Sequence, residues 1–192
     1  TNGHTEDLRT VIRHTLATRD YASIVLLGFS MGGNLTLLML GQDQDAVPSP
    51  IKGVIGFSVP TDLAASSRRL ADWENLFYMQ RFLRKLKRKL RAKRAQFPDR
   101  VNLRGYWRIR SFQHFDDRYT APMHGFEDAL DYWRRCSCLP RLGDIRIPGL
   151  LVNAADDPFL GDPAIPIAAV AANPLLSLEL PRYGGHVGFV ER

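Results

Sequence analysis

Ser30 stands in a glycine-rich turn of the kind that places a nucleophile. Residues 28–32 read G-x-S-x-G and lie between an apolar run typical of a strand and one typical of a helix. A sharp turn of this kind holds its serine in a strained backbone conformation, which requires neighbours without a Cβ atom. The glycines expected to meet that need are Gly28, Gly32 and Gly33. The pattern predicts Ser30 as a nucleophile and the backbone N–H of Met31 as an oxyanion donor; a turn without chemistry is the alternative.

A serine nucleophile needs a histidine base, and the histidine needs a carboxylate that orients it. Asp156 and Asp157 follow an apolar run, and His186 lies further along between glycines. The order serine, acid, histidine is that of one known class of triad. We favour Asp157 because it stands directly before Pro158, and Asp156 remains the alternative acid. The alternative interpretation of His186 is that it is a surface-loop histidine without a catalytic role.

Few other side chains in the sequence offer catalytic or metal-binding chemistry. Cys136 and Cys138 are the only cysteines, and one intervening residue suits neither a disulfide framework nor a four-ligand zinc site. We therefore expect no metal and no organic cofactor, and a reducing compartment such as the cytoplasm. The remaining histidines are expected to be surface or packing residues: His4, His14, His114 and His124.

Helices and strands alternate along most of the chain. The expected helices are 5–16, Leu35–Leu40 ending at Gly41, and Ala164–Ala172 with Pro166 in its first turn. The expected strands are Ile24–Leu27, Val54–Phe57, Leu150–Val152 and Leu176–Leu180. The first is a short continuous apolar run, as in a strand buried on both faces. This alternation predicts an α/β fold with a parallel sheet.

A long insertion, residues 63–135, interrupts the alternation and contains most of the basic character. The chain has 26 Lys and Arg against 20 Asp and Glu, yet nine of the cations and no acid lie within Arg81–Arg94. Apolar side chains share one helical face there: Met79, Phe82, Leu83, Leu86 and Leu90. We expect an amphipathic helix in a cap over the carboxyl edge of the sheet.

The basic helix has three interpretations. Its cationic face is simply solvated, or it makes a peripheral contact with an anionic membrane, or it binds nucleic acid. The sequence disfavours nucleic acid, because clustered cations supply electrostatics without a base-reading motif. A non-catalytic binding module that uses Arg81–Arg94 is therefore the alternative to an enzyme. The composition, 45% hydrophobic and 24% charged, excludes a disordered or collagen-like chain.

Several stretches together resemble a known family of enzymes. They are residues 28–34 (GFSMGGN), 58–63 (SVPTDL), 120–126 (TAPMHGF), 153–159 (NAADDPF) and 184–189 (GGHVGF). The chain resembles the α/β-hydrolases, and within them the YheT-like hydrolases related to the abhydrolase-domain lipases. The resemblance implies a triad of Ser30, Asp157 and His186 with Met31 in the oxyanion hole.

The activity implied is that of a serine hydrolase which cleaves a small-molecule or lipid carboxylic ester through an acyl-enzyme. An acyltransferase that uses the same triad is the alternative. The aromatic residues of the insertion are interpreted either as the wall of an apolar pocket or as core: Phe112, Phe115, Tyr119 and Phe126.

The sequence departs from the resembled family before residue 30. Family members have four strands ahead of the strand that leads to the nucleophile, whereas here only one helix precedes that strand, Ile24–Leu27. We therefore expect a single partial α/β-hydrolase domain over residues 1–192, with the equivalents of strands five to eight. Ile24–Leu27 then becomes a sheet edge, apolar on both faces. We expect this chain to be weakly stable or prone to aggregation, and to hydrolyse esters slowly.

Overall fold

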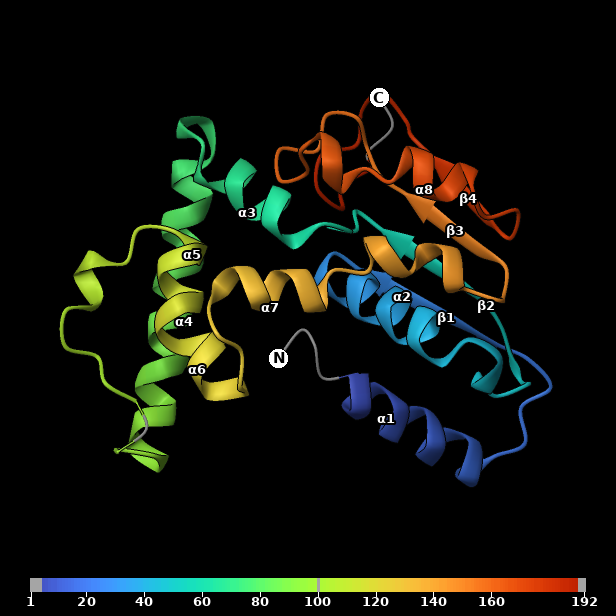
Figure 1. Ribbon diagram of the computed structural model, residues 1–192, viewed down its shortest axis with the longest axis horizontal. Helices are drawn as coiled ribbons and strands as arrows, with labels where there is room; N and C mark the ends of the chain where they lie inside the picture. Colours follow the sequence, from blue (N-terminus) through green and yellow to red (C-terminus); the bar gives the residue numbers. More distant parts are fainter. Residues whose placement is uncertain (1–4, 100, 190–192) are drawn as a thin grey trace.

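The sheet has four parallel strands, and their order across the sheet is their order in the chain. The computed structural model describes residues 5–99 and 101–189. The strands are β1 (Ile24–Phe29), β2 (Ile51–Phe57), β3 (Gly149–Val152) and β4 (Leu176–Glu179), arranged β1-β2-β3-β4 (Figure 1). All three pairings are parallel, which confirms the predicted α/β class. The carboxyl ends of all four strands therefore lie at one edge.

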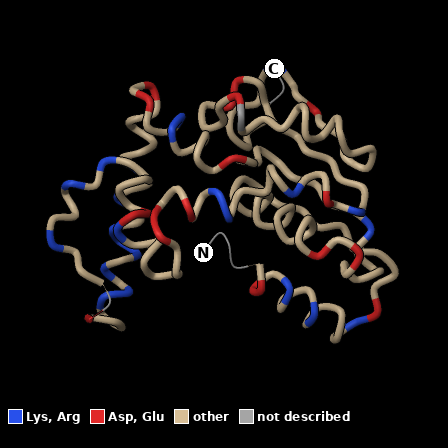
Figure 2. Tube along the Cα trace, in the orientation of Figure 1, with Lys and Arg blue, Asp and Glu red and all other residues tan. Residues whose placement is uncertain are grey.

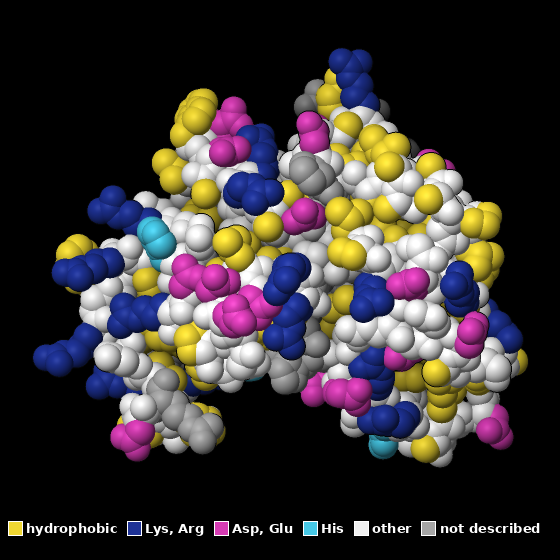
Figure 3. All heavy atoms as spheres, in the orientation of Figure 1, with side chains coloured by type: hydrophobic (Ala, Val, Ile, Leu, Met, Phe, Trp, Pro, Cys, Tyr) yellow, Lys and Arg dark blue, Asp and Glu magenta, His cyan; other side chains and the backbone are white. Residues whose placement is uncertain are grey.

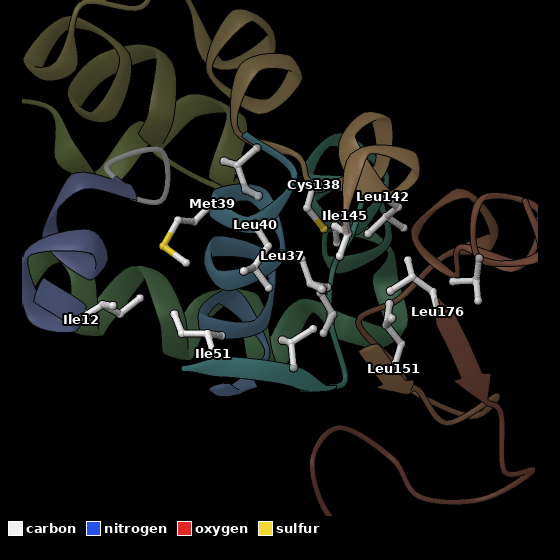
Figure 4. Packing of buried hydrophobic residues seen from close by; sticks show 14 residues of the cluster. Ile12, Leu37, Met39, Leu40, Ile51, Cys138, Leu142, Ile145, Leu151 and Leu176 are labelled. Atoms are coloured by element: carbon white, nitrogen blue, oxygen red, sulfur yellow. The ribbon is translucent and has the colours of Figure 1, made fainter. Parts of the chain in front are cut away.

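The main core lies between the sheet and helix α2 (Met31–Asp43). Leu37 and Leu40 of α2 are fully buried in one cluster with Ile51 of β2 and Leu151 of β3 (Figure 4). Helix α1 (Thr5–Thr18) joins this cluster through Ile12, and α8 (Ile167–Ala171) and a 3₁₀ helix at Leu139–Asp144 pack on it further along. Burial of this apolar cluster fixes α2, and so the turn that precedes it.

Strand β1 is an edge of the described sheet, as predicted, but only one of its faces is buried. Val25, Leu27 and Phe29 are each more than half exposed, while Ile24 and Leu26 pack against the main core. The expectation of a strand buried on both faces was therefore wrong for the described residues. A continuous apolar run in the sequence does not indicate which face of the strand other segments cover.

Two helix boundaries differ from those expected. Gly41 lies inside α2, where a Cβ atom would come within 2.5 Å of the Arg141 carbonyl oxygen; its role is close packing rather than helix termination. Pro166 precedes α8 instead of lying in its first turn, and a short 3₁₀ helix occupies Asp162–Ala164. Proline restricts the residue before it to extended backbone, and Ile165 is extended.

The segment between β2 and β3 folds into helices beside the carboxyl edge of the sheet (Figure 1). These are α3 (Leu63–Ala71), α4 (Leu76–Gln96), α5 (Phe112–Phe115), α6 (Ala121–His124) and α7 (Ala129–Cys136). The same segment contains 3₁₀ turns at Trp73–Asn75 and Tyr106–Arg108, and another 3₁₀ turn, Gln44–Ala46, lies before β2. We call residues 63–135 the cap.

Helix α4 is amphipathic, as predicted. Met79, Leu83 and Leu90 are buried in the cap core, and Phe82 and Leu86 are partly buried against it. Basic residues mark the rest of the helix (Figure 2). Over residues 5–99 and 101–189, we find no helix with the length and apolar character needed to cross a membrane.

The exposed face of β1 generates a prediction about self-association. Leu27→Lys should lower association, because a lysine on an edge strand opposes pairing with another strand. Val11→Lys is the matched control, since Val11 is an exposed apolar residue of α1. Sedimentation velocity over a range of concentrations measures the effect. Equal association of the two variants would contradict the prediction.

Candidate active site

Ser30 occupies a strained position between β1 and α2. Its φ is 50° and its ψ is −124°, outside the regions that a residue with a Cβ atom normally adopts. Its N–H donates to the Phe57 carbonyl oxygen at 2.8 Å, which fixes the turn against β2. Such strain costs about 1–3 kcal/mol and persists only where surrounding contacts impose it.

Glycine is required at two of the three expected positions. A Cβ atom at Gly28 would lie 2.6 Å from the Gly33 Cα atom, and one at Gly33 would lie 2.6 Å from a methyl group of Val59. Gly32 faces open space, with no heavy atom near such a Cβ atom. The expectation for Gly32 was therefore wrong, because a side chain there would meet no other part of the turn.

The structure brings Ser30, His186 and Asp157 into one hydrogen-bonded chain. The Ser30 Oγ atom lies 3.0 Å from His186 Nε2, and His186 Nδ1 lies 2.8 Å from Asp157 Oδ2. The Asp157 side chain is fully buried and that of His186 is 17% exposed. Asp156 instead accepts a hydrogen bond from the Gly185 N–H at 2.8 Å. Asp157 thus contacts the histidine, while Asp156 fixes the loop that carries it.

Neighbouring residues hold this chain of contacts in place. The Phe159 N–H donates to the second oxygen of Asp157 at 2.9 Å, and the Phe159 ring packs 4.6 Å from the His186 ring. The Val187 N–H donates to Ser58 Oγ at 3.1 Å. Ser58 and Val187 have φ values of 50° and 58°, so backbone strain gathers around the site. Sequence analysis assigned none of these three a role, although each neighbours a predicted or motif residue.

Two buried asparagines connect distant segments near the site. Asn34, in the first turns of α2, donates to the Cys136 carbonyl oxygen at 2.8 Å and accepts from the Cys138 N–H at 2.9 Å. Asn153 accepts from the Val59 N–H at 3.0 Å. Both side chains are fully buried. Both lie in stretches that carry the family resemblance, 28–34 and 153–159, but no role was predicted for either.

Met31 is the first residue of α2. The first N–H groups of a helix have no acceptor within the helix, and they lie at the positive end of its dipole. The Met31 N–H therefore stands beside the Ser30 hydroxyl at the end of a helix that favours negative charge.

A mostly apolar cavity of about 370 Å³ opens onto Ser30 and His186. Its apolar lining comes largely from the cap: Pro60, Leu63, Leu70, Phe82, Leu86, Phe112, Phe115, Tyr132, Trp133, Phe159 and Leu160. Of the predicted aromatic wall, Phe112 and Phe115 line the cavity. Tyr119 is buried in the cap core, and Phe126 packs against Tyr132 instead.

The other candidate residues lie away from this cavity. Cys136 and Cys138 are free and buried, and burial raises the pKa of Cys136 to about 11. His14, His114 and His124 do not line the cavity, and His4 lies outside the described residues. No cluster of three potential metal ligands occurs in the parts of the chain that the structure describes.

A parallel sheet with a strained serine turn after one strand, and a histidine after another, is the arrangement of an α/β-hydrolase. The family described as "alpha/beta hydrolase fold" matches residues 1–192. The chain therefore belongs to the α/β-hydrolase family.

Two individual proteins are similar to this chain over nearly its whole length. It is 32% identical over 191 residues to the YheT protein of Escherichia coli (strain K12), covering 98% of this chain and 55% of that protein. It is 35% identical to the phospholipase ABHD3 of Homo sapiens, covering 98% of this chain and 46% of the relative. The chain thus spans about half the length of these relatives.

A solved structure supports the same fold. The esterase domain of a Rhodothermus marinus protein superimposes with a TM-score of 0.51 at 19% identity, covering 97% of this chain and 60% of that chain. Identity this low supports the fold alone.

The contacts of Asn34 generate a prediction about stability. Asn34→Ala should lower the free energy of unfolding by about 1–3 kcal/mol, because it leaves a buried carbonyl and a buried N–H unpaired. Urea unfolding measures the change. Asn102→Ala is the control: among the described residues, its exposed side chain accepts only from the Arg104 N–H, so a change within about 0.5 kcal/mol is expected. Equal effects of the two substitutions would refute the prediction.

Proposed function

We propose that the protein is a serine hydrolase of carboxylic esters. The observation that carries the proposal is the hydrogen-bonded chain from Ser30 through His186 to Asp157, at the mouth of an apolar cavity. Ser30 is the nucleophile, His186 the general base and Asp157 the residue that orients the histidine. Membership of the α/β-hydrolase family supports this assignment.

The distances suit the required proton transfers. His186 Nε2 takes the proton from the Ser30 hydroxyl as the oxygen attacks the ester carbonyl. The Nδ1–H of His186 donates to Asp157, which fixes the tautomer and stabilises the imidazolium that forms. His186 then delivers the proton to the departing alcohol, leaving an acyl group on Ser30. Water, deprotonated by the same histidine, releases the acid.

Met31 is the proposed donor to the developing negative charge. Its N–H lies at the first position of α2, where both the free donor and the helix dipole favour an oxyanion. Removal of one such donor typically costs about 10²–10³ in rate, so the strained turn serves catalysis through this N–H as well as through the position of Ser30.

The cavity supports a substrate with an apolar part. Rings and aliphatic side chains of the cap form most of its walls, which suits an acyl chain better than a polar group. One relative is named a phospholipase, so a lipid ester is the class of substrate that we propose. Residues 63–135 then act as the cap of a single catalytic domain.

Acyl transfer is the alternative outcome of the same chemistry. If an alcohol replaces water in the second step, the acyl-enzyme yields a new ester. Analysis of the products formed in the presence of ethanol distinguishes the two, because a hydrolase releases mainly the free acid.

The two neighbouring aspartates provide the test of the triad. A fluorophosphonate should label the chain at Ser30, and Ser30→Ala should abolish labelling. Asp157→Asn should slow labelling by about 10⁴, the effect of replacing the acid in a known triad. Asp156→Asn is the matched control and should stay within about tenfold, since its side-chain oxygen still accepts from Gly185.

Labelling is the better readout here, since we expect slow turnover by this chain. Comparable losses in the two aspartate variants would reject Asp157 as the specific partner. Labelling that persists in Ser30→Ala would reject the proposed nucleophile.

A second proposal concerns membrane contact through α4. Its cations are exposed except Lys87, which packs over the Tyr106 ring, and the described residues include no acidic partner in an ion pair with them. Lys and Arg side chains gather on the side of the molecule where α4 lies (Figure 3). Leu76 and Phe77 are exposed at the start of the helix. Basic and apolar side chains together suit the surface of an anionic membrane.

Charge substitution tests this contact. Changing Lys85, Arg88 and Lys89 to Gln should weaken binding to phosphatidylserine-containing vesicles on the order of a hundredfold, at about 1 kcal/mol per cation. Co-sedimentation measures binding, which should also fall with salt.

The control for this test changes three exposed cations elsewhere to Gln: Arg19, Lys52 and Arg146. An equal loss in the control would show that net charge, rather than α4, is responsible. Unchanged binding by the α4 variant would contradict the proposed membrane contact and indicate that these cations are simply solvated.

A further inference from the structure

The cavity contains two buried polar side chains that the proposed mechanism does not use. Ser66 of α3 and Asp116 of the cap are 7% and 8% exposed, and both line the cavity that opens onto Ser30. A buried polar group is usually hydrogen-bonded, because an unmade bond costs about 1–3 kcal/mol. Each of these two side chains is therefore expected to have a hydrogen-bond partner, although most of the residues around them are aromatic or aliphatic.

Ser66 lacks such a partner in the part of the chain that the structure describes. Its Oγ atom is buried and forms no hydrogen bond with the described residues. A helical serine can bond to a carbonyl in the preceding turn, but this one does not. The hydroxyl therefore keeps one donor and two acceptor positions free.

Asp116 has partners but retains capacity. Its Oδ1 accepts from Thr120 Oγ1 at 2.5 Å and its Oδ2 accepts from Trp133 Nε1 at 2.9 Å. A carboxylate accepts at about four positions, so two bonds leave acceptor positions available. Burial raises the pKa of Asp116, so its surroundings disfavour charge.

The backbone at Asp116 is also unusual. Asp116–Thr120 forms a π-helical turn between α5 and α6, and both of its end residues line the cavity. π-helical turns are rare and frequently occur at functional sites. This turn presents the Asp116 carboxyl and the Thr120 hydroxyl on the cavity side of the cap.

We propose that Ser66 and Asp116 form a subsite that binds a hydroxyl group of the substrate. A hydroxyl both donates and accepts, which matches a free serine hydroxyl and a carboxyl group with spare acceptor positions that line the same cavity. It is neutral, which suits a place that disfavours charge. The inference rests on the proposed function and narrows its substrate class to esters that carry a hydroxyl on either the acyl or the alcohol part.

Selectivity follows from the same buried groups. An ester without the hydroxyl offers the Ser66 Oγ atom no partner, whereas a hydroxylated ester offers one. Sites built to bond a hydroxyl reject analogues that lack it for this reason.

Trp133 supplies a reporter that needs no turnover. It lines the cavity and bonds to Asp116, whereas the two remaining tryptophans, Trp73 and Trp107, are 80% and 71% exposed. Changing those two to Phe leaves Trp133 as the only tryptophan, and Ser30→Ala prevents the esters from being consumed. Quenching of its fluorescence then gives a Kd for each ester.

Two matched pairs of esters distinguish a hydroxyl on the alcohol part of the substrate from one on the acyl part. The first pair is 2-hydroxyethyl hexanoate against propyl hexanoate, and the second is methyl 6-hydroxyhexanoate against methyl heptanoate. In one pair the hydroxylated ester should bind about threefold to tenfold more tightly, the range of one neutral hydrogen bond. Ser66→Ala should abolish this preference and leave the Kd of the plain ester unchanged.

Unfolding provides the control for a structural role. Ser66→Ala should leave the midpoint of thermal unfolding the same or higher, since its hydroxyl bonds to none of the described residues. Equal binding within both pairs, or a preference that survives Ser66→Ala, would overturn the inference. Failure of Ser30 to react with a fluorophosphonate would reject the proposed hydrolase while leaving this binding test intact.

Discussion

The strained turn at Ser30 is the constraint on which the rest of the site depends. A serine at a φ of 50° is held there by a hydrogen bond to β2 and by the burial of α2. Leu37 and Leu40 cannot leave the core without releasing the turn. The hydrophobic core therefore supplies the free energy that keeps the nucleophile in position, and the close approach of Gly28 and Gly33 sets the geometry.

The cap and the sheet are joined by polar contacts between segments far apart in the sequence. Asn34 ties α2 to the last residue of α7 and to the segment after it, and Asn75 of the cap donates to the Pro158 carbonyl oxygen in the loop that carries Asp157. Buried bonds of this kind exist only when both segments are in place, so they couple the cap to the turn at Ser30. The shape of the cavity consequently depends on the same contacts that hold the nucleophile.

Local patterns predicted much of this structure. Apolar runs located the four strands, helical spacing located α4, and turn glycines with chain order located Ser30, Asp157 and His186. The exposed face of β1, and the cavity positions of Ser66 and Asp116, depend on which distant segment packs there. A serine in a helix looks the same in a sequence whether it meets water, a carbonyl group or a cavity.

The order of the strands has a consequence for folding. Each strand pairs with the one before it in the chain, so the sheet can grow from β1 to β4 while the chain is being synthesised. The turn at Ser30 needs only β1, α2 and β2, whereas His186 arrives after β4. The proposed nucleophile is thus placed early and the proposed base last, so that Ser30 meets His186 only once the sheet is assembled.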